Sequence, residues 1–235
     1  MMRKRLANAT LLGILIFSAA ALAADPEANY PDPRRFAVDV EAFTAQEQIA
    51  APPQDAVLCI GSSSLRFWHD TISDDLQPLT LIPRGFGGST MLDVLHYSAQ
   101  IVVPYQPRAI LLYEGDNDIH FGVSPARFLA TVQQFLELIH ATKPETRIYF
   151  LAVKPSPSRW DLWPQMQEAN ILLQQLCTGD PLLTFIDIAT PMLGDDGRPR
   201  PELFLADDLH MNEKGYEIWR QEVRRVMVDR EAAFE

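Results

Sequence analysis

An acid, a histidine and a serine-rich turn stand in two short segments of the sequence. Asp207 precedes His210 by three positions, a spacing at which the carboxylate can orient the imidazole. Far upstream, a turn from Gly61 to Ser64 follows an apolar run. A serine hydroxyl there can give its proton to such an imidazole and attack an acyl carbon, which is the chemistry of acyl transfer. Each of the three serines in the turn is a candidate nucleophile, and Asp208 is an alternative orienting acid.

Short apolar runs alternate with amphipathic stretches, and these elements must position the reactive residues. Continuous apolar runs are typical of strands that are buried on both faces of a parallel sheet. The predicted strands are residues 56–60, 79–82, 109–113, 147–153 and 183–188. The predicted helices are residues 36–50, 90–100, 165–177 and 213–228, and one that Ser124 caps with Pro125 at its first position. This order predicts an α/β fold, a three-layer α/β/α sandwich around a mostly parallel five-stranded sheet.

Four polar or glycine-rich segments are expected at one rim of that sheet. Residues 61–64 follow the first strand, residues 84–90 the second and residues 114–118 the third. Residues 207–210 lie in the loop before the last helix. Open parallel sheets bind ligands beyond the carboxyl ends of their strands, so the sequence predicts a ligand site at this rim.

At these four segments the chain resembles the SGNH hydrolases, also called the GDSL esterase/lipase family. The first block of the family, Gly-Asp-Ser, matches residues 61–63 and makes Ser63 the nucleophile by register. Gly88 matches the glycine of the second block, residues 115–118 match Gly-x-Asn-Asp, and residues 207–210 match Asp-x-x-His. The resemblance covers roughly residues 40–228, and the Gly-Ser-Ser-Ser first block is similar to that of a bacterial, exported branch.

One position departs from the family pattern. The usual aspartate before the nucleophile is Ser62 here, so this position supplies no charge. Ser62 and Ser64 therefore stay as rival nucleophiles beside Ser63. Asp116, Asp118 and His120 could also suggest a metal site, but their order matches the third block better.

The resemblance implies a flavodoxin-like fold and an acyl-enzyme mechanism with Ser63, Asp207 and His210 as catalytic residues. It also implies an oxyanion hole made by the backbone N–H groups of Ser63 and Gly88 and the side-chain amide of Asn117. Glycine leaves room for the substrate oxygen, and an asparagine amide donates without charge. This chemistry needs no metal and no cofactor.

The N-terminus carries the pattern of an export signal. Arg3, Lys4 and Arg5 precede an apolar stretch, and residues 21–23 are small. We expect a signal peptide over residues 1–23, a leader and helix over residues 24–53, and the hydrolase domain over residues 54–235. The mature protein is expected to be exported, periplasmic or secreted, without stable membrane insertion after cleavage.

The amino-acid composition limits the classes of binding partner that we expect. The formal net charge of −11 argues against nucleic acid and anionic membrane surfaces, because both are themselves negative. Two cysteines, Cys59 and Cys177, leave a disulfide open in an exported protein.

We therefore expect an exported serine esterase that acts on a small-molecule, glycan or lipid ester. An acetyl or other short-acyl ester fits an exported enzyme without a long apolar lid, and a lysophospholipid or other lipid ester is the alternative within this class. The alternative from another class is a non-catalytic carbohydrate-binding protein on the same fold.

Overall fold

A five-stranded parallel sheet forms the centre of the molecule. The structure is a computed structural model that describes residues 30–235, so the predicted signal peptide lies outside the described residues. The strands run in the order β2-β1-β3-β4-β5, which is the flavodoxin-like order. They are β1 (Val57–Gly61), β2 (Leu81–Gly85), β3 (Ala109–Tyr113), β4 (Arg147–Leu151) and β5 (Leu183–Ile186).

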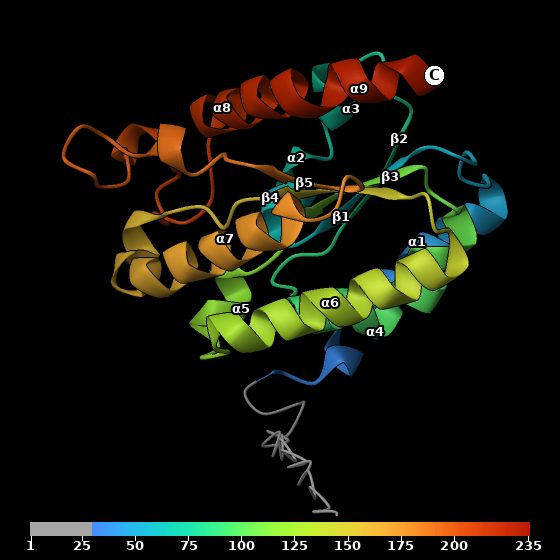
Figure 1. The fold of residues 1–235 in the computed structure, drawn as a ribbon, viewed down its shortest axis with the longest axis horizontal. Coiled ribbons are helices and arrows are strands. Elements are labelled where there is room, and N and C mark those ends of the chain that lie inside the picture. The colour runs from blue at the N-terminus through green and yellow to red at the C-terminus, as the bar shows by residue number, and fades with distance from the viewer. Residues whose placement is uncertain (1–29) are drawn as a thin grey trace, which may run out of the picture.

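Helices cover both faces of this sheet, as Figure 1 shows with α8 and α9 on one side and α1, α4 and α6 on the other. The longer helices are α1 (Ala37–Ile49), α4 (Met91–Ile101), α6 (Pro125–Thr142), α7 (Trp163–Thr178) and α8 (Glu213–Val223). The shorter ones are α2 (Ser63–Trp68), α3 (Ile72–Asp75), α5 (Asp116–His120) and α9 (Asp229–Glu231). Short turns of helix are η1 (Pro33–Phe36), η2 (Val103–Tyr105), η3 (Pro157–Leu162), η4 (Thr190–Met192), η5 (Pro201–Leu203), η6 (Arg224–Val228) and η7 (Ala232–Phe234). The predicted three-layer α/β/α sandwich is confirmed.

The second strand differs most from its predicted position. Residues 79–82 were expected, but β2 runs from Leu81 to Gly85 and pairs with β1 over its whole length. Pro83 is tolerated because β2 is an edge strand. A Cβ on Gly85 would lie 2.4 Å from the backbone nitrogen of Arg66, so glycine is required where α2 crosses the strand end. The predicted fourth and fifth strands also end earlier, at Leu151 and Ile186.

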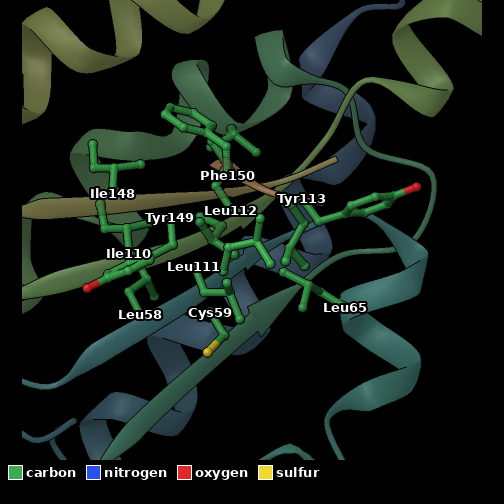
Figure 2. Packing of buried hydrophobic residues seen from close by; sticks show 14 of the residues in the cluster. Leu58, Cys59, Leu65, Ile110, Leu111, Leu112, Tyr113, Ile148, Tyr149 and Phe150 are labelled. Atoms are coloured by element: carbon green, nitrogen blue, oxygen red, sulfur yellow. The ribbon is translucent and has the colours of Figure 1, made fainter. Parts of the chain in front are cut away.

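The core lies on both faces of the central strands. Every residue of β1 and β3 is buried, which explains why these strands are continuously apolar in sequence. Adjacent strands contribute paired residues to each face, such as Cys59 with Leu111 and Leu112 with Phe150, and Figure 2 shows these residues together with Leu65 of α2. The site-bearing loops are therefore attached to the most thoroughly packed part of the molecule.

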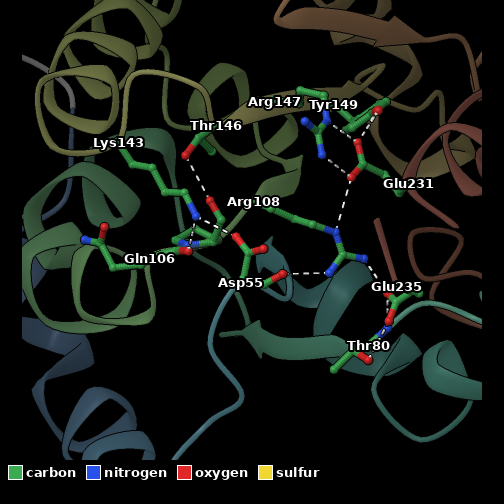
Figure 3. Close-up of polar contacts among 11 residues, drawn as sticks. Asp55, Thr80, Gln106, Arg108, Lys143, Thr146, Arg147, Tyr149, Glu231 and Glu235 are labelled. Atoms are coloured by element: carbon green, nitrogen blue, oxygen red, sulfur yellow. Dashed lines mark hydrogen bonds and ion pairs between the residues drawn. The ribbon is translucent and has the colours of Figure 1, made fainter. Parts of the chain in front are cut away.

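A buried ionic network fastens the C-terminus to the amino end of the sheet (Figure 3). The Glu231 carboxylate is fully buried and accepts hydrogen bonds from Arg147 at 2.6 and 2.7 Å and from the Tyr149 hydroxyl at 2.6 Å. Arg108 lies 3.5 Å from the same carboxylate and also pairs with Glu235. Burial opposes ionisation of Glu231, but the hydrogen bonds from Arg147 and Tyr149 lower its pKa below the usual range.

Both cysteines are free thiols, so the disulfide left open by the sequence does not form in this structure. Cys59 is buried in β1 and Cys177 is half-buried near the end of α7. Burial raises the pKa of both thiols to about 12. No helix between residues 30 and 235 is long and apolar enough to cross a membrane.

Candidate active site

The turn between β1 and α2 places a serine at the carboxyl end of the sheet. Gly61 has a φ of +147°, and a Cβ there would lie 2.0 Å from the carbonyl oxygen of Tyr113 on β3. Only glycine permits this approach, which lets the chain leave β1 and start α2 at once. Ser63 is the first residue of α2, so its backbone N–H belongs to the first turn, where helix N–H groups have no intrahelical acceptor.

Ser63, His210 and Asp207 form a continuous chain of hydrogen bonds. The Oγ of Ser63 lies 3.0 Å from Nε2 of His210, and Nδ1 of His210 lies 2.6 Å from Oδ2 of Asp207. The other oxygen of Asp207 accepts the backbone N–H groups of Leu209 and His210, at 3.0 and 2.9 Å. A carboxylate can only accept, so Nδ1 carries the proton and Nε2 is left to accept the serine hydroxyl.

The other candidate serines and the other candidate acid take no part in this chain of hydrogen bonds. The hydroxyls of Ser62 and Ser64 are buried and have no hydrogen-bond partner within the described part of the chain. Asp208 has a left-handed backbone conformation, with φ of +56°, and its carbonyl oxygen accepts the N–H of Ser158. Among these candidates, the structure brings only Ser63 and Asp207 to His210.

Hydrogen bonds hold the carboxyl of Asp207 in its ionised form. The side chain is 49% exposed. Desolvation opposes its charge, but hydrogen bonds from the His210 ring and from the backbone N–H groups lower its pKa to about 2. The ring of Phe67, one turn along α2 from Ser63, packs 4.7 Å from the His210 ring and limits its movement.

Gly87, the residue before the glycine of the second block, lies close to Ser63. A Cβ on Gly87 would be 3.9 Å from that of Ser63. Gly88 has a φ of +84°, and open space surrounds its Cβ position, so a ligand atom can approach the backbone there. The carbonyl oxygen of Gly88 accepts a hydrogen bond at 3.2 Å from Arg35, which also donates at 2.7 Å to the buried carboxylate of Asp93.

Asn117, at the start of α5, has a fixed amide orientation. Its Nδ2 donates to the carbonyl oxygen of Ser89 at 2.9 Å, and its Oδ1 accepts from Arg159 at 3.0 Å. One amide N–H and the backbone N–H groups of Ser63 and Gly88 have no acceptor among residues 30–235. The bond from Asn117 to Ser89, the neighbour of Gly88, ties the loop that carries Asn117 to the loop that carries Gly88.

The segment that carries Asn117 also contains the buried carboxyls of Glu114 and Asp118. Burial, followed by the charge of Asp118, raises the pKa of Glu114 well above its usual range, and Ser89 donates to Glu114 at 2.5 Å. Burial also raises the pKa of Asp118 to about 7, although Asp118 accepts the N–H groups of Met91 and Gly115. Asp118 therefore caps helices. Within the described residues, no three His, Cys, Asp or Glu side chains form a group that could hold a metal ion.

Sequence reasoning missed three cationic residues that contact the site: Arg35, Lys154 and Arg159. Lys154 gave the clearest signal, because a lysine that ends an apolar strand run at the carboxyl rim is expected to be buried with a partner. Arg35 precedes α1 in a segment that was assigned to a leader and helix outside the hydrolase domain, so nothing in its sequence context pointed to the site.

A groove of about 970 Å³ adjoins the His210 side of the site, between α2 and the start of α8. Phe67 and Leu205, both exposed, are among its few apolar lining residues. The surface that faces the groove is mostly apolar, although most of the residues that line it have polar or charged side chains: Arg66, Asp70, Thr71, Asp75, Glu202, Asn212, Glu213, Lys214, Glu217 and Arg220.

Solved structures with this fold come from several bacteria. A GDSL-like lipase from Bacteroides thetaiotaomicron superposes with a TM-score of 0.69 at 18% identity, over 82% of this chain and 98% of that one. A lipase/acylhydrolase from Enterococcus faecalis gives 0.59 at 20% identity, over 74% and 96%. A catalytic mutant of an acetylxylan esterase from Geobacillus stearothermophilus gives 0.60 at 14% identity, over 74% and 94%.

These identities are low, so the likenesses establish the fold alone. No protein of curated function is significantly similar to the chain in sequence. The family model of the GDSL-like lipase/acylhydrolases matches residues 52–218, which include the Ser63 turn, the Gly88 and Asn117 loops and the His210 loop. The chain therefore belongs to the GDSL-like lipase/acylhydrolase family.

Proposed function

We propose that the protein is an exported serine esterase that hydrolyses short-acyl carboxylic esters through an acyl-enzyme. The observation that carries this proposal is the chain of hydrogen bonds from Ser63 through His210 to Asp207. A nucleophile, a base and an orienting acid in this order are the requirements of acyl transfer. Membership of an acylhydrolase family supports it, and the signal pattern of residues 1–23 supports export to the periplasm or beyond.

In the first half of the reaction, Ser63 Oγ attacks the ester carbon while Nε2 of His210 takes its proton. The carbonyl oxygen becomes an oxyanion that accepts the N–H groups of Ser63 and Gly88 and the free N–H of Asn117. Collapse breaks the ester C–O bond, and His210 returns the proton to the leaving alkoxide. Asp207 holds the imidazole in the correct tautomer and stabilises the imidazolium.

In the second half, water replaces the alcohol. His210 takes a proton from the water, whose oxygen attacks the acyl carbon, and the same donors bind the new oxyanion. Collapse returns the proton to Ser63 and releases the carboxylic acid. Each donor contributes about 3 kcal/mol to lowering the barrier.

The groove beside His210 offers room for the alcohol part of the ester. His210 protonates the leaving oxygen, so the alcohol leaves from the side of the site that this groove adjoins. Its charged and polar side chains can hydrogen-bond to hydroxyl groups, and the apolar surface between them can pack against carbon atoms of the alcohol. An acetyl ester of a glycan or other small molecule is the substrate class that we propose, because the charged and polar side chains of the groove can bind several hydroxyl groups.

The test is hydrolysis of p-nitrophenyl acetate, butyrate and octanoate by the mature protein, with Ser63→Ala and Ser64→Ala in parallel. Ser64 is the matched control, because its hydroxyl is buried and has no partner within residues 30–235. We expect a loss of about 10³-fold or more in Ser63→Ala, little change in Ser64→Ala, and the highest kcat/KM on acetate.

Other outcomes would contradict parts of this proposal. Retained turnover in Ser63→Ala would mean that another group is the nucleophile. A preference for octanoate would favour a lipid ester. If wild type did not exceed Ser63→Ala on these esters or on acetylated oligosaccharides, the carbohydrate-binding alternative would be favoured.

A further inference from the structure

A fully enclosed lysine links the histidine loop to the third block. Lys154 lies three residues beyond the end of β4, and its side chain is 1% exposed. Its ammonium donates at 2.9 Å to the carbonyl oxygen of Leu209 and lies 3.6 Å from Oδ2 of Asp116. The N–H of the same peptide group belongs to His210 and donates to Asp207 at 2.9 Å. The peptide group that leads into His210 is thus held at both ends.

A guanidinium on the same loop holds the oxyanion donor. Arg159 lies in η3, and its side chain is 11% exposed. Its Nη2 donates to Oδ1 of Asn117 at 3.0 Å, and its Nη1 lies 3.4 Å from Oδ2 of Asp116. The planar fork of arginine holds both neighbours in one fixed geometry, which the freely rotating ammonium of a lysine would not impose.

Asp116 joins the two cations. Its side chain is 4% exposed, and the same oxygen faces both Lys154 and Arg159. The three residues therefore form one buried cluster, which we call the rim cluster, between the His210 peptide and the Asn117 amide. Desolvating three charges is expensive, and buried ion pairs are often no more stabilising than apolar packing. What the rim cluster contributes here is a fixed distance between two segments of chain.

We propose that Lys154, Asp116 and Arg159 act as positioning residues that hold His210 and Asn117 in register across Ser63. This inference rests on the proposed function, because it assigns His210 as base and Asn117 as oxyanion donor. Arg159 acts through Asn117, and Lys154 acts through the peptide of His210. Loss of either therefore misplaces a reacting partner without removing it.

The first experiment compares kcat and KM for Arg159→Met and Lys154→Met with those of wild type. A misplacement of about 1 Å can lower a rate about 100-fold, so we expect kcat to fall by 10- to 100-fold with KM nearly unchanged. The matched control is Arg147→Met, which removes an equally buried guanidinium at the amino end of the sheet. This control should unfold at a lower temperature than wild type and keep its kcat.

Two further measurements separate positioning from general damage. In an Asn117→Ala background, Arg159→Met should change kcat by no more than about twofold, because the group through which Arg159 acts is gone. Arg159→Lys should recover only part of the lost kcat. In the NMR spectrum, Lys154→Met should shift or broaden the downfield Nδ1 proton of the His210–Asp207 bond, and Arg147→Met should leave it in place.

The outcomes are distinguishable from failure of the proposed function. If Ser63→Ala abolishes turnover but Arg159→Met and Lys154→Met keep wild-type kcat, only the positioning role is overturned. Full additivity of Arg159→Met with Asn117→Ala, or equal kcat losses in all three Met variants, would also overturn it. Retained turnover in Ser63→Ala would overturn the proposed function itself.

Discussion

Replacing Asp207 by asparagine should reduce activity more than replacing it by alanine. In the structure, Oδ1 of Asp207 accepts two backbone N–H groups, and Oδ2 accepts from Nδ1 of His210. In Asp207→Asn the amide oxygen keeps the two backbone donors, so the NH₂ group must face Nδ1. That group donates to Nδ1 and favours the tautomer with the proton on Nε2, which cannot accept the proton of Ser63. Asp207→Ala leaves the tautomer free.

The size of each loss follows from the geometry. The carboxylate lies 2.6 Å from Nδ1, but its 49% exposure implies strong screening. With an effective dielectric constant of about 40 to 80, the carboxylate of Asp207 stabilises the imidazolium by about 1.6 to 3 kcal/mol. Asp207→Ala should therefore lose about 15- to 200-fold in kcat/KM. The adverse hydrogen bond in Asp207→Asn, worth about 1 kcal/mol, adds at least about fivefold.

The assay is kcat/KM for p-nitrophenyl acetate at neutral pH, where Asp207, with its pKa of about 2, is fully ionised. Asp208→Asn is the matched control, because asparagine tolerates the left-handed φ of +56° at this neighbouring position. Its activity should stay close to wild type. If Asp207→Asn proved as active as Asp207→Ala, or more active, the assignment of the tautomer through the two backbone donors would be refuted.

Three further predictions concern single contacts. Asn117→Ala should lower kcat by about 10²- to 10³-fold with little change in KM in steady-state assays, since it removes one oxyanion donor. Arg35→Met frees the carbonyl of Gly88, and we expect kcat to fall by about 10-fold while far-UV circular dichroism is unchanged. Glu231→Gln should lose about 3 to 5 kcal/mol of unfolding free energy in urea at pH 7 and keep its kcat. Because folding lowers the pKa of Glu231, this difference should shrink as the pH falls below 4.5, and a constant difference would contradict it.

Much of the fold could be predicted, because a strand that is buried on both faces of the sheet appears in the sequence as a continuous apolar run. The strand over residues 109–113 was predicted with its observed bounds, since each of its residues is buried and apolar. The end of β2 was not predicted, because Arg84 and Gly85 are residues of types that are more typical of a loop. Their strand conformation comes from pairing with β1, and Arg84 is accommodated by contacts with Tyr105 and Glu47 that lie far away in sequence.

The candidate site was predictable to the extent that its parts lie in short blocks. Ser63, Asp207 and His210 could be named, but the choice among three adjacent serines depends on the helical phase of α2. That phase buries the hydroxyls of Ser62 and Ser64 and leaves Ser63 at His210. The supporting cations could not be named as site residues, because their partners are brought to them only by the folded sheet.

Buried ionic clusters at the two ends of the same sheet allow stability and positioning to be measured separately. At the amino end, Arg147 and Glu231 fasten the C-terminal helix and contact none of the proposed reacting groups. At the carboxyl end, Arg159 and Asp116 also pair a guanidinium with a carboxylate, but this pair adjoins Asn117. An arginine-to-methionine change removes one guanidinium from either cluster and leaves a carboxylate behind. The difference in kcat between the two variants, rather than either loss alone, therefore measures what the position of a buried charge contributes to the reaction.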